Sequence, residues 1–448
     1  MSVNISDKLI NLISKKYHTN KEVTLIKFKQ ELSTRKIDKF TYNLYFKFIL
    51  ILFREFLIFF LKISKLFFSK KIFLSDSSFL LGFPNESIFL KNDVSYFQRF
   101  WQEGPLKNFC KNTKILIFTD KKNTNIYSDN FQYYSCYISY LINTLEKKEK
   151  INLLITFIKD LSILIKISFK EQIALIICRD ICYLSLFKVI SKKQKNLNFF
   201  FNANSYSHNI ICLNESSKFK TYFCYYSMNN LPVTYSKNSI LKISDYNYIY
   251  QYLYINYHLI WNDYHELSLK KLGLKYGKFT KTGPYLYYLD DKIISKKSNR
   301  VVIFDVEPYK NVSFNDSYYN TDYCIKFLKD ILSALNNIKN IEIILKHKIR
   351  SRSTIEKYDE KYNNFILENK KYIKIADREE NLFTLINSSN LCINFPYTST
   401  ATIAKSLGVK SIYFDSTNTL DNQEYGIEIV KGSKELNKFI NIFYKNNI

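Results

Sequence analysis

An apolar run, a proline and three hydroxyl residues follow one another in Leu391-Cys392-Ile393-Asn394-Phe395-Pro396-Tyr397-Thr398-Ser399-Thr400-Ala401. This pattern predicts a buried strand over 391–394 and a short helix over 401–407 that ends at Gly408. Amide groups and hydroxyls at such a helix start suit a phosphate or a carboxylate. A Ser/Thr helix cap in an ordinary loop explains the same residues, so both interpretations stay open.

The same alternation continues on both sides of this stretch. Between 300 and 448, apolar runs predict strands at 301–306, 341–345, 372–376, 391–394 and 409–414. Helical patterns lie at 321–338, 355–368, 380–388 and 434–445. Short connections between such elements indicate a doubly wound Rossmann-like domain. It has no Gly-x-Gly-x-x-Gly turn and no Walker loop, so no dinucleotide cofactor is expected.

The upstream half alternates less regularly. Apolar runs predict strands at 114–119, 173–178, 199–203, 221–226, 255–261 and 279–282, and helices are predicted at 134–146, 151–168 and 262–272. We therefore expect the α/β class, with two Rossmann-like domains and an N-terminal amphipathic helical segment. The expected boundaries are 1–75 for the helical segment, 76–284 and 300–448 for the two domains, and 285–299 for the linker.

The positive charge is concentrated in the first two thirds of the chain. Residues 300–448 carry 21 basic and 18 acidic side chains, a net of +3, so residues 1–299 carry +23 of the total of +26. A basic N-terminal part suits an anionic membrane surface. No helix-turn-helix, zinc-finger or ribonucleoprotein motif supports nucleic acid as a partner.

Residues 45–68 form the most apolar segment of the basic part. Its charged residues are Lys47, Arg54, Glu55, Lys62 and Lys65. On a helix these five fall within an arc of about 100°, and the other face is Phe, Leu and Ile. A membrane-spanning helix would bury the charges, whereas a helix in the membrane interface keeps them in water. We expect an interfacial helix, and a surface helix packed on the protein core is the alternative.

The cysteines give no sign of metal or disulfide chemistry. None of the eight is in a Cys-x-x-Cys pair, and several lie in apolar runs, which is typical of a reducing compartment. The first 40 residues do not resemble a signal peptide. No spacing resembles a metal site and no Asp-x-Asp pair follows a strand, so neither a metal nor another cofactor is expected. These features favour the cytoplasm.

In open α/β sheets, ligands bind beyond the carboxyl ends of the strands. Two such ends in the C-terminal domain carry a basic cluster and the hydroxyl-rich helix start, which together form a candidate anion site for a nucleotide-sugar phosphate. A solvated basic loop is the alternative for the cluster, and a structural role is the alternative for its histidine. The candidate donor-binding residues are Lys346, His347, Lys348, Arg350, Pro396, Tyr397, Thr398, Ser399 and Thr400.

In the N-terminal half, carboxylates after strands or on loops are candidates for a catalytic base. They are Glu103, Asp120 and Asp180, although solvated acidic caps are common at such positions. Polar residues at two further strand ends could bind an acceptor sugar or only turn the chain. They are Asn204, Ser205, Ser227 and Asn229.

The stretch 393–401 followed by 406–415 resembles the bacterial surface-polysaccharide proteins named for a Pro-Phe-Thr-Ser motif, with Tyr397 in place of the phenylalanine. Two Rossmann-like halves, the Thr282-Gly283-Pro284 turn and the Lys-rich strand end at 346–348 also look like GT-B glycosyltransferases. The resemblance implies metal-independent sugar transfer from a nucleotide sugar to a growing surface glycan, such as capsule or lipooligosaccharide.

In this mechanism, positive groups and the helix start stabilise the departing phosphate, and a base activates the acceptor hydroxyl. The implied partners are a nucleotide sugar, a glycan or lipid-linked acceptor and, through residues 45–68, the inner face of the cytoplasmic membrane. Two other classes remain open. One is a catalytically idle nucleotide-binding assembly protein of the glycan pathway, and the other is a nucleotide-sugar epimerase.

Overall fold

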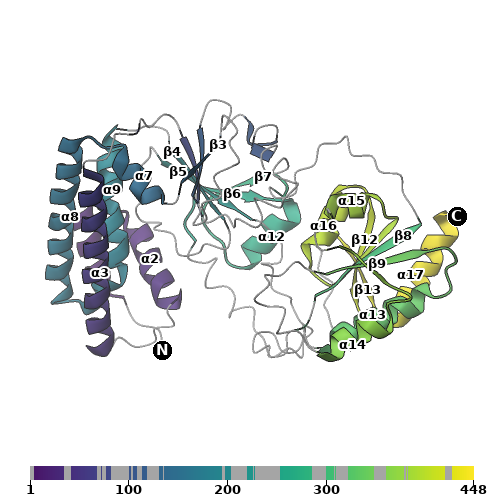
Figure 1. Cartoon of the computed structure of the whole chain (residues 1–448). Helices are drawn as coiled ribbons and strands as arrows, with labels where there is room; N and C mark the ends of the chain where they lie inside the picture. Colours follow the sequence, from purple (N-terminus) through teal and green to yellow (C-terminus); the bar gives the residue numbers. More distant parts are fainter. Residues whose placement is uncertain are drawn as a thin grey trace. The chain divides into compact units, whose positions relative to one another are not determined.

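The computed structural model describes residues 5–34, 42–67, 72, 77–81, 100–101, 104–107, 114–118, 131–134, 136–193, 197–202, 219–225, 227, 253–284, 299–306, 308, 321–347, 360–377, 380, 382–418 and 426–447. The chain forms two compact units: residues 1–226 with 244–288, and residues 227–243 with 289–448 (Figure 1). The first unit takes in the N-terminal helices that we assigned to a separate segment. The main part of the second begins within the predicted linker.

A sheet of parallel strands forms the centre of the first unit, in the order β3-β2-β1-β4-β5-β6-β7. Its strands are β1 (Ser77–Leu81), β2 (Lys114–Phe118), β3 (Phe131–Tyr134), β4 (Leu197–Asn202), β5 (Phe219–Cys224), β6 (Tyr257–Ile260) and β7 (Lys278–Lys281). Aromatic side chains fill its core: Phe200 stacks on Tyr222 at 4.4 Å between ring centroids, and Trp101 meets Phe200 edge-on at 4.7 Å. Such runs of large apolar residues are typical of parallel strands that are covered on both faces.

Helices form a layer of their own beside this sheet. They are α1 (Asp7–Tyr17), α2 (Lys21–Thr34), α3 (Tyr42–Phe67), α7 (Tyr137–Asn143), α8 (Lys147–Ser168), the 3-10 helix η1 (Gln172–Ile177) and α9 (Cys178–Lys193). α3, α8 and α9 lie side by side (Figure 1). A further helix, α12 (Asp263–Lys271), follows β6 and agrees with the helix predicted at 262–272.

The predicted strand at 173–178 is wrong. Residues 172–177 form η1, which leads directly into α9, and Ala174 to Ile177 are buried. A six-residue apolar run satisfies a buried helix as well as a buried strand, so its hydrophobicity did not distinguish them. The helix predicted at 134–146 also begins too early, since Phe131–Tyr134 is the edge strand β3.

The second unit has the regular pattern that the sequence predicts. Its parallel sheet has the order β10-β9-β8-β11-β12-β13, which is the Rossmann order 3-2-1-4-5-6. The strands are β8 (Arg300–Phe304), β9 (Glu342–Lys346), β10 (Lys374–Ile375), β11 (Leu391–Asn394), β12 (Lys410–Asp415) and β13 (Glu428–Lys431). The helices are α13 (Thr321–Leu335), α14 (Glu360–Glu368), α15 (Leu382–Asn387), α16 (Ser399–Ser406) and α17 (Gly432–Asn447). The fold class of two Rossmann-like α/β domains is confirmed.

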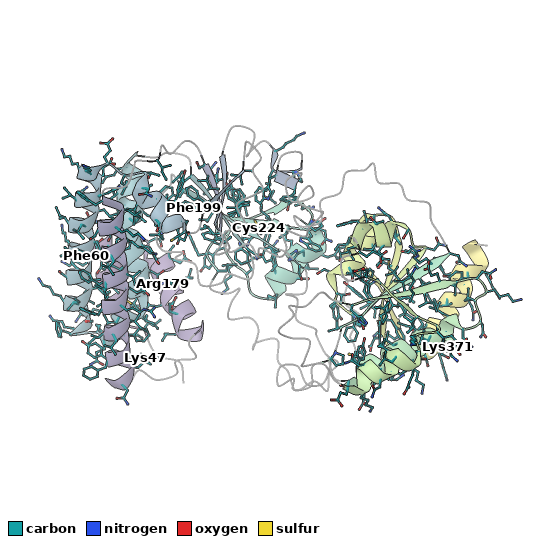
Figure 2. All side chains as sticks on the ribbon, viewed as in Figure 1. Lys47, Phe60, Arg179, Phe199, Cys224 and Lys371 are labelled. Atoms are coloured by element: carbon teal, nitrogen blue, oxygen red, sulfur yellow. The ribbon has the colours of Figure 1, made fainter. Side chains whose placement is uncertain are left out.

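The helix predicted over 45–68 is α3, and it packs on the protein along one stripe. Phe48, Leu52, Phe59 and Ile63 are buried against neighbouring helices, while other apolar side chains of α3 are exposed. Figure 2 labels Lys47 and Phe60 on this helix. Within the described ranges, no helix is long and apolar enough to cross a membrane. The core-helix alternative therefore holds for one face, and the membrane contact stays a prediction.

Candidate functional site

The candidate site lies where the strand order of the second unit reverses. β8 pairs with β9 on one side and with β11 on the other. From β8 the chain continues to β9, and from β11 it continues to β12, so the connections that leave the neighbouring strands β8 and β11 run toward opposite edges of the sheet. The register sets Phe304 opposite Lys346 in β9 and opposite Asn394 in β11. The three strands thus end at one level, and this switch point is where open α/β sheets bind ligands.

The loop after β11 is held rigidly. The Phe395 N–H donates to the Phe304 carbonyl at 2.8 Å, and the Phe395 ring packs edge-on against Tyr323 and Phe327 of α13. Pro396 is buried. Tyr397 has a left-handed backbone with φ 62°, and its buried ring packs against Tyr413. Tyr397 therefore shapes the turn and leaves little ring surface for stacking on a base.

Asn394 connects the strand end to the helix start. Its amide nitrogen donates to Ser411 Oγ at 3.0 Å and to the Ile412 carbonyl at 3.1 Å, both in the neighbouring strand β12. Its Oδ1 accepts a hydrogen bond from Thr400 Oγ1 at 2.7 Å. Because Asn394 is fully buried, these bonds fix the first turn of α16 relative to the sheet.

Thr398 is the residue before the first helical position of α16, but its side chain does not cap the helix. Its backbone is extended, with φ −72° and ψ 143°, as at other helix starts. The Thr398 hydroxyl instead turns back and donates to the Phe395 carbonyl at 2.8 Å. Residues 398–400 are half-buried, so the positive end of the helix is accessible. This arrangement favours the interpretation as an anion site over the interpretation as an ordinary helix cap.

Lys346 points away from this helix start. It is 7% exposed, and its Nζ donates to the carbonyls of Asp377 and, at 3.1 Å, Glu380. Burial lowers the pKa of Lys346, and Glu380 and Asp377 oppose that shift. The side chain therefore holds the turn between β10 and α15. Its predicted role at a donor phosphate stays a prediction.

His347 belongs to a cluster that the sequence did not reveal. Its Nδ1 lies 3.3 Å from the carboxylate of Asp305, the residue after β8. The Tyr362 hydroxyl, from α14, donates to the same carboxylate. Asp305 directly follows an apolar strand, and this position could have indicated it as a site residue. Nothing in the sequence indicated Tyr362 as its partner.

Several candidates lie outside the described residues: Glu103, Asp120, Asn204, Ser205, Asn229, Lys348 and Arg350. Ser227 belongs to the second unit, where its hydroxyl accepts a hydrogen bond from Ser399 Oγ at 3.0 Å. Among the parts of the chain that the structure describes, no group of three or more His, Cys, Asp or Glu side chains could hold a metal ion. The absence of a metal cofactor stays a prediction.

Asp180 is not at a strand end, because the predicted strand before it is helical. It lies in the first turn of α9, is 2% exposed, and is 3.3 Å from Lys27 Nζ. Lys27, also buried, lies 2.9 Å from Glu31. Burial raises the pKa of Asp180, and Lys27 opposes that shift. The reason for naming Asp180 as a base is thereby removed, and the contacts are those of a buried structural ion pair.

Several solved structures resemble this chain at low sequence identity. Sucrose-phosphate synthase from Thermosynechococcus elongatus is 11% identical over 83% of this chain and 90% of that chain, with a TM-score of 0.45. The wall teichoic acid polymerase TagF is 11% identical over 91% and 93%, with a TM-score of 0.40. UDP-GlcNAc 2-epimerase from Neisseria meningitidis is 12% identical over 82% and 90%, with a TM-score of 0.38. No curated protein sequence matches this chain.

A family profile gives the stronger comparison. The profile described as "Polysaccharide biosynthesis PFTS motif protein" matches residues 162–440, which is more than half of the chain. The match includes β11, the loop 395–398 and α16, on which the resemblance of the sequence rested. The chain therefore belongs to the family of polysaccharide biosynthesis PFTS motif proteins.

Proposed function

We propose that the chain is a GT-B-type glycosyltransferase that moves a sugar from a nucleotide-activated donor to a growing surface glycan. The observation that carries the proposal is the start of α16 at the switch point of the second sheet. The side chain that would ordinarily cap this helix bonds the Phe395 carbonyl instead. A nucleotide-sugar phosphate is an anion that suits the accessible amide end, and the family acts in polysaccharide biosynthesis.

The proposed reaction needs charge stabilisation more than covalent chemistry. A bond forms between the acceptor oxygen and the anomeric carbon while the bond from that carbon to the phosphate oxygen breaks. The departing phosphate gains negative charge, which the amide groups and dipole of α16 stabilise. A carboxylate, for which Glu103 and Asp120 are the candidates, takes the proton of the acceptor hydroxyl. No step requires a metal ion.

We also propose the finer setting of this activity. The acceptor is a capsule, lipopolysaccharide, lipooligosaccharide or related glycan, free or lipid-linked, and the enzyme works at the inner face of the cytoplasmic membrane. Residues 45–68 supply the membrane contact. Two features support it: the net charge of +23 in residues 1–299, and the apolar side chains that α3 leaves exposed.

The donor site is tested by Ser399→Pro. Ser399 is the first helical residue of α16, where proline keeps the helix but removes one N–H donor. The extended backbone of Thr398 also suits the residue before a proline. Calorimetry with CMP, UDP and GDP should show that the variant binds the preferred nucleotide about tenfold or more weakly, since a charge-assisted hydrogen bond is worth about 1.5–3 kcal/mol.

Two variants complete the experiment. Lys147→Pro is the matched control, because Lys147 is the first residue of α8 after an N-cap of similar backbone conformation, φ −71° and ψ 163°. Ser399→Ala removes only the hydroxyl and should bind nearly as the parent does. Unchanged nucleotide binding by Ser399→Pro would contradict the site. Binding without sugar transfer to any glycan acceptor would favour the assembly protein, and isomerisation of a free nucleotide sugar would favour the epimerase.

A further inference from the structure

Helix α3 has two apolar faces. Its buried apolar stripe is Phe48, Leu52, Phe59 and Ile63, with the buried Glu55 beside them. At about 100° per residue, a second apolar stripe lies about 150° around the helix axis from the first. The second stripe consists of Phe46, Leu50, Phe53, Leu57, Phe60 and Leu61. These side chains are exposed, up to 71% for Leu50, so the core accounts for only one of the two faces.

Helix α8 repeats this arrangement. Its buried residues include Leu153, Phe157, Leu161 and Leu164. About 120° around the axis from them, exposed apolar side chains recur at intervals of three, four or seven residues: Ile151, Ile155, Ile158 and Ile165 on the helix, and Phe169 just after it. Such spacing keeps them on one face, within an arc of about 80°.

The two exposed stripes adjoin. Lys150 Nζ, near the start of α8, donates to the Leu66 carbonyl near the end of α3 at 2.6 Å. Phe157, further along α8, packs against Phe59 at 4.4 Å and against Phe56 at 5.7 Å between ring centroids. The helices are therefore antiparallel neighbours, and Figure 1 shows them side by side.

Continuing this register along the helices pairs the stripes residue by residue. It brings Leu50 level with Ile165, Leu57 level with Ile158 and Phe60 level with Ile155. From Phe46 to Leu61 the shared strip is about 22 Å long, at 1.5 Å per residue. We call it the α3–α8 strip. An apolar strip of this length on a protein surface is typical of an interaction site.

Cations border the α3–α8 strip on both long sides. On α3, the exposed Lys47, Arg54 and Lys65 lie on the flank away from α8. On and just after α8, the exposed basic residues on the flank away from α3 are Lys148, Lys159, Lys166 and Lys170. One of these cations is compensated: Arg54 pairs with the largely buried Glu55 at 2.7 Å. Asp160 is buried and pairs with Lys188 of α9 at 3.2 Å, and Glu149 accepts from a backbone N–H at its own helix start at 2.7 Å.

We propose that α3 and α8 together form the surface with which the protein lies on an anionic lipid bilayer. Both helices lie in the membrane plane, the α3–α8 strip enters the acyl boundary, and the flanking cations meet lipid phosphates. This charge pattern favours a bilayer over a second copy of the chain, because a twofold contact across the strip would bring like-charged flanks together. The inference extends the proposed membrane contact of 45–68 to a second helix and does not depend on sugar transfer.

The test is flotation of the full chain with vesicles of phosphatidylcholine alone or mixed with phosphatidylglycerol. The parent should float with the mixed vesicles and much less with the neutral ones. The double substitutions Leu50→Gln/Phe53→Gln on α3 and Ile155→Gln/Ile158→Gln on α8 should each lower the vesicle partition coefficient about tenfold or more. Lys159→Gln/Lys166→Gln should lower it about tenfold for the mixed vesicles only.

Matched controls use equally exposed residues of the second unit. Leu367→Gln/Ile442→Gln replaces side chains that are 60% and 50% exposed, and Lys329→Gln/Lys438→Gln replaces exposed lysines. Both controls should float like the parent. Nucleotide calorimetry on every variant separates this proposal from the donor site, because replacing exposed residues of α3 or α8 should leave donor binding unchanged.

Three results would overturn the proposal. The first is full flotation of the α8 apolar variant, which would limit the contact to α3. The second is equal flotation of the parent with neutral and mixed vesicles, which would show that anionic lipid is not required for binding. The third is a parent dimer in sedimentation that the α3 variant dissociates, without vesicle binding by the parent, which would assign the strip to a second copy.

Discussion

Asp180→Asn should destabilise the first unit without altering the chemistry of the enzyme. The substitution leaves Lys27, which is 1% exposed, without its closest partner on α9. Removing one member of a buried ion pair costs about 3–5 kcal/mol. Since Glu31 remains 2.9 Å from Lys27 and is partly exposed, the loss should fall near the lower end, about 3 kcal/mol. That is a large fraction of the stability of an ordinary domain, about 5–15 kcal/mol.

Urea unfolding followed by tryptophan fluorescence measures this loss directly. The chain has two tryptophans, Trp101 and Trp261, and both belong to the first unit, so the signal reports that unit. Glu266→Gln breaks the exposed pair with Lys270 and is the matched control, with an expected loss below about 1 kcal/mol. The double substitution Lys27→Met/Asp180→Leu should recover most of the stability, because it removes both charges.

One result would refute this reasoning. If Asp180→Asn unfolds at the parent's urea concentration but transfers no sugar, the role of Asp180 is not to stabilise the fold through its ion pair with Lys27. Asp180 would then return as the catalytic base. Loss of stability with a normal turnover number in the folded fraction is the expected outcome.

Three further predictions concern pH, metal and the base. His258 accepts a hydrogen bond from the Tyr225 hydroxyl through Nδ1 and donates one from Nε2 to the Tyr276 carbonyl. Burial lowers the pKa of His258 to about 4. As the pH falls, this imidazole is therefore protonated in the unfolded chain before it is protonated in the folded one. The contribution of His258 to stability should fall by about 3 kcal/mol as the pH drops from about 6.5 to about 4, so stability should depend less on pH in His258→Asn than in the parent, and equal pH dependence of the two urea midpoints would contradict this. EDTA should leave sugar transfer unchanged, whereas a loss that Mg²⁺ or Mn²⁺ restores would disprove metal independence. Either Glu103→Gln or Asp120→Asn should lower kcat about 10²–10⁴-fold with nucleotide binding intact, and full activity in both would exclude them as the base.

The second unit could be predicted because its pattern is strong at every level. Apolar strands of ordinary length, short turns and amphipathic helices such as α13 all indicate the same fold. The strand that was missed, β13, has four residues at the sheet edge with Glu428 and Lys431 at its ends, so it offers no apolar run. In the first unit, β1 was also missed. This inner strand begins with the buried Ser77 and Ser78, so its apolar run is too short to predict a strand.

The site could be predicted only as a location. The proline and the hydroxyl residues marked the strand-to-helix turn, and parallel strand ends gather at one edge. The direction of each side chain depends on packing that the sequence does not show. The Thr398 hydroxyl turns back to its own loop, Lys346 turns inward to two carbonyls, and Asp305 acquires partners from α14 and from His347, the residue after β9.

The strand order of the second unit has a consequence for its synthesis. β8, the first strand made, lies in the interior of the sheet, and β9 and then β10 add to one open edge. β11, β12 and β13 then add in turn to the other edge, so no strand has to insert between two that are already paired. The sheet can therefore assemble while the chain leaves the ribosome. Premature termination after β12 would remove one edge strand and α17 but leave the strands at the switch point paired.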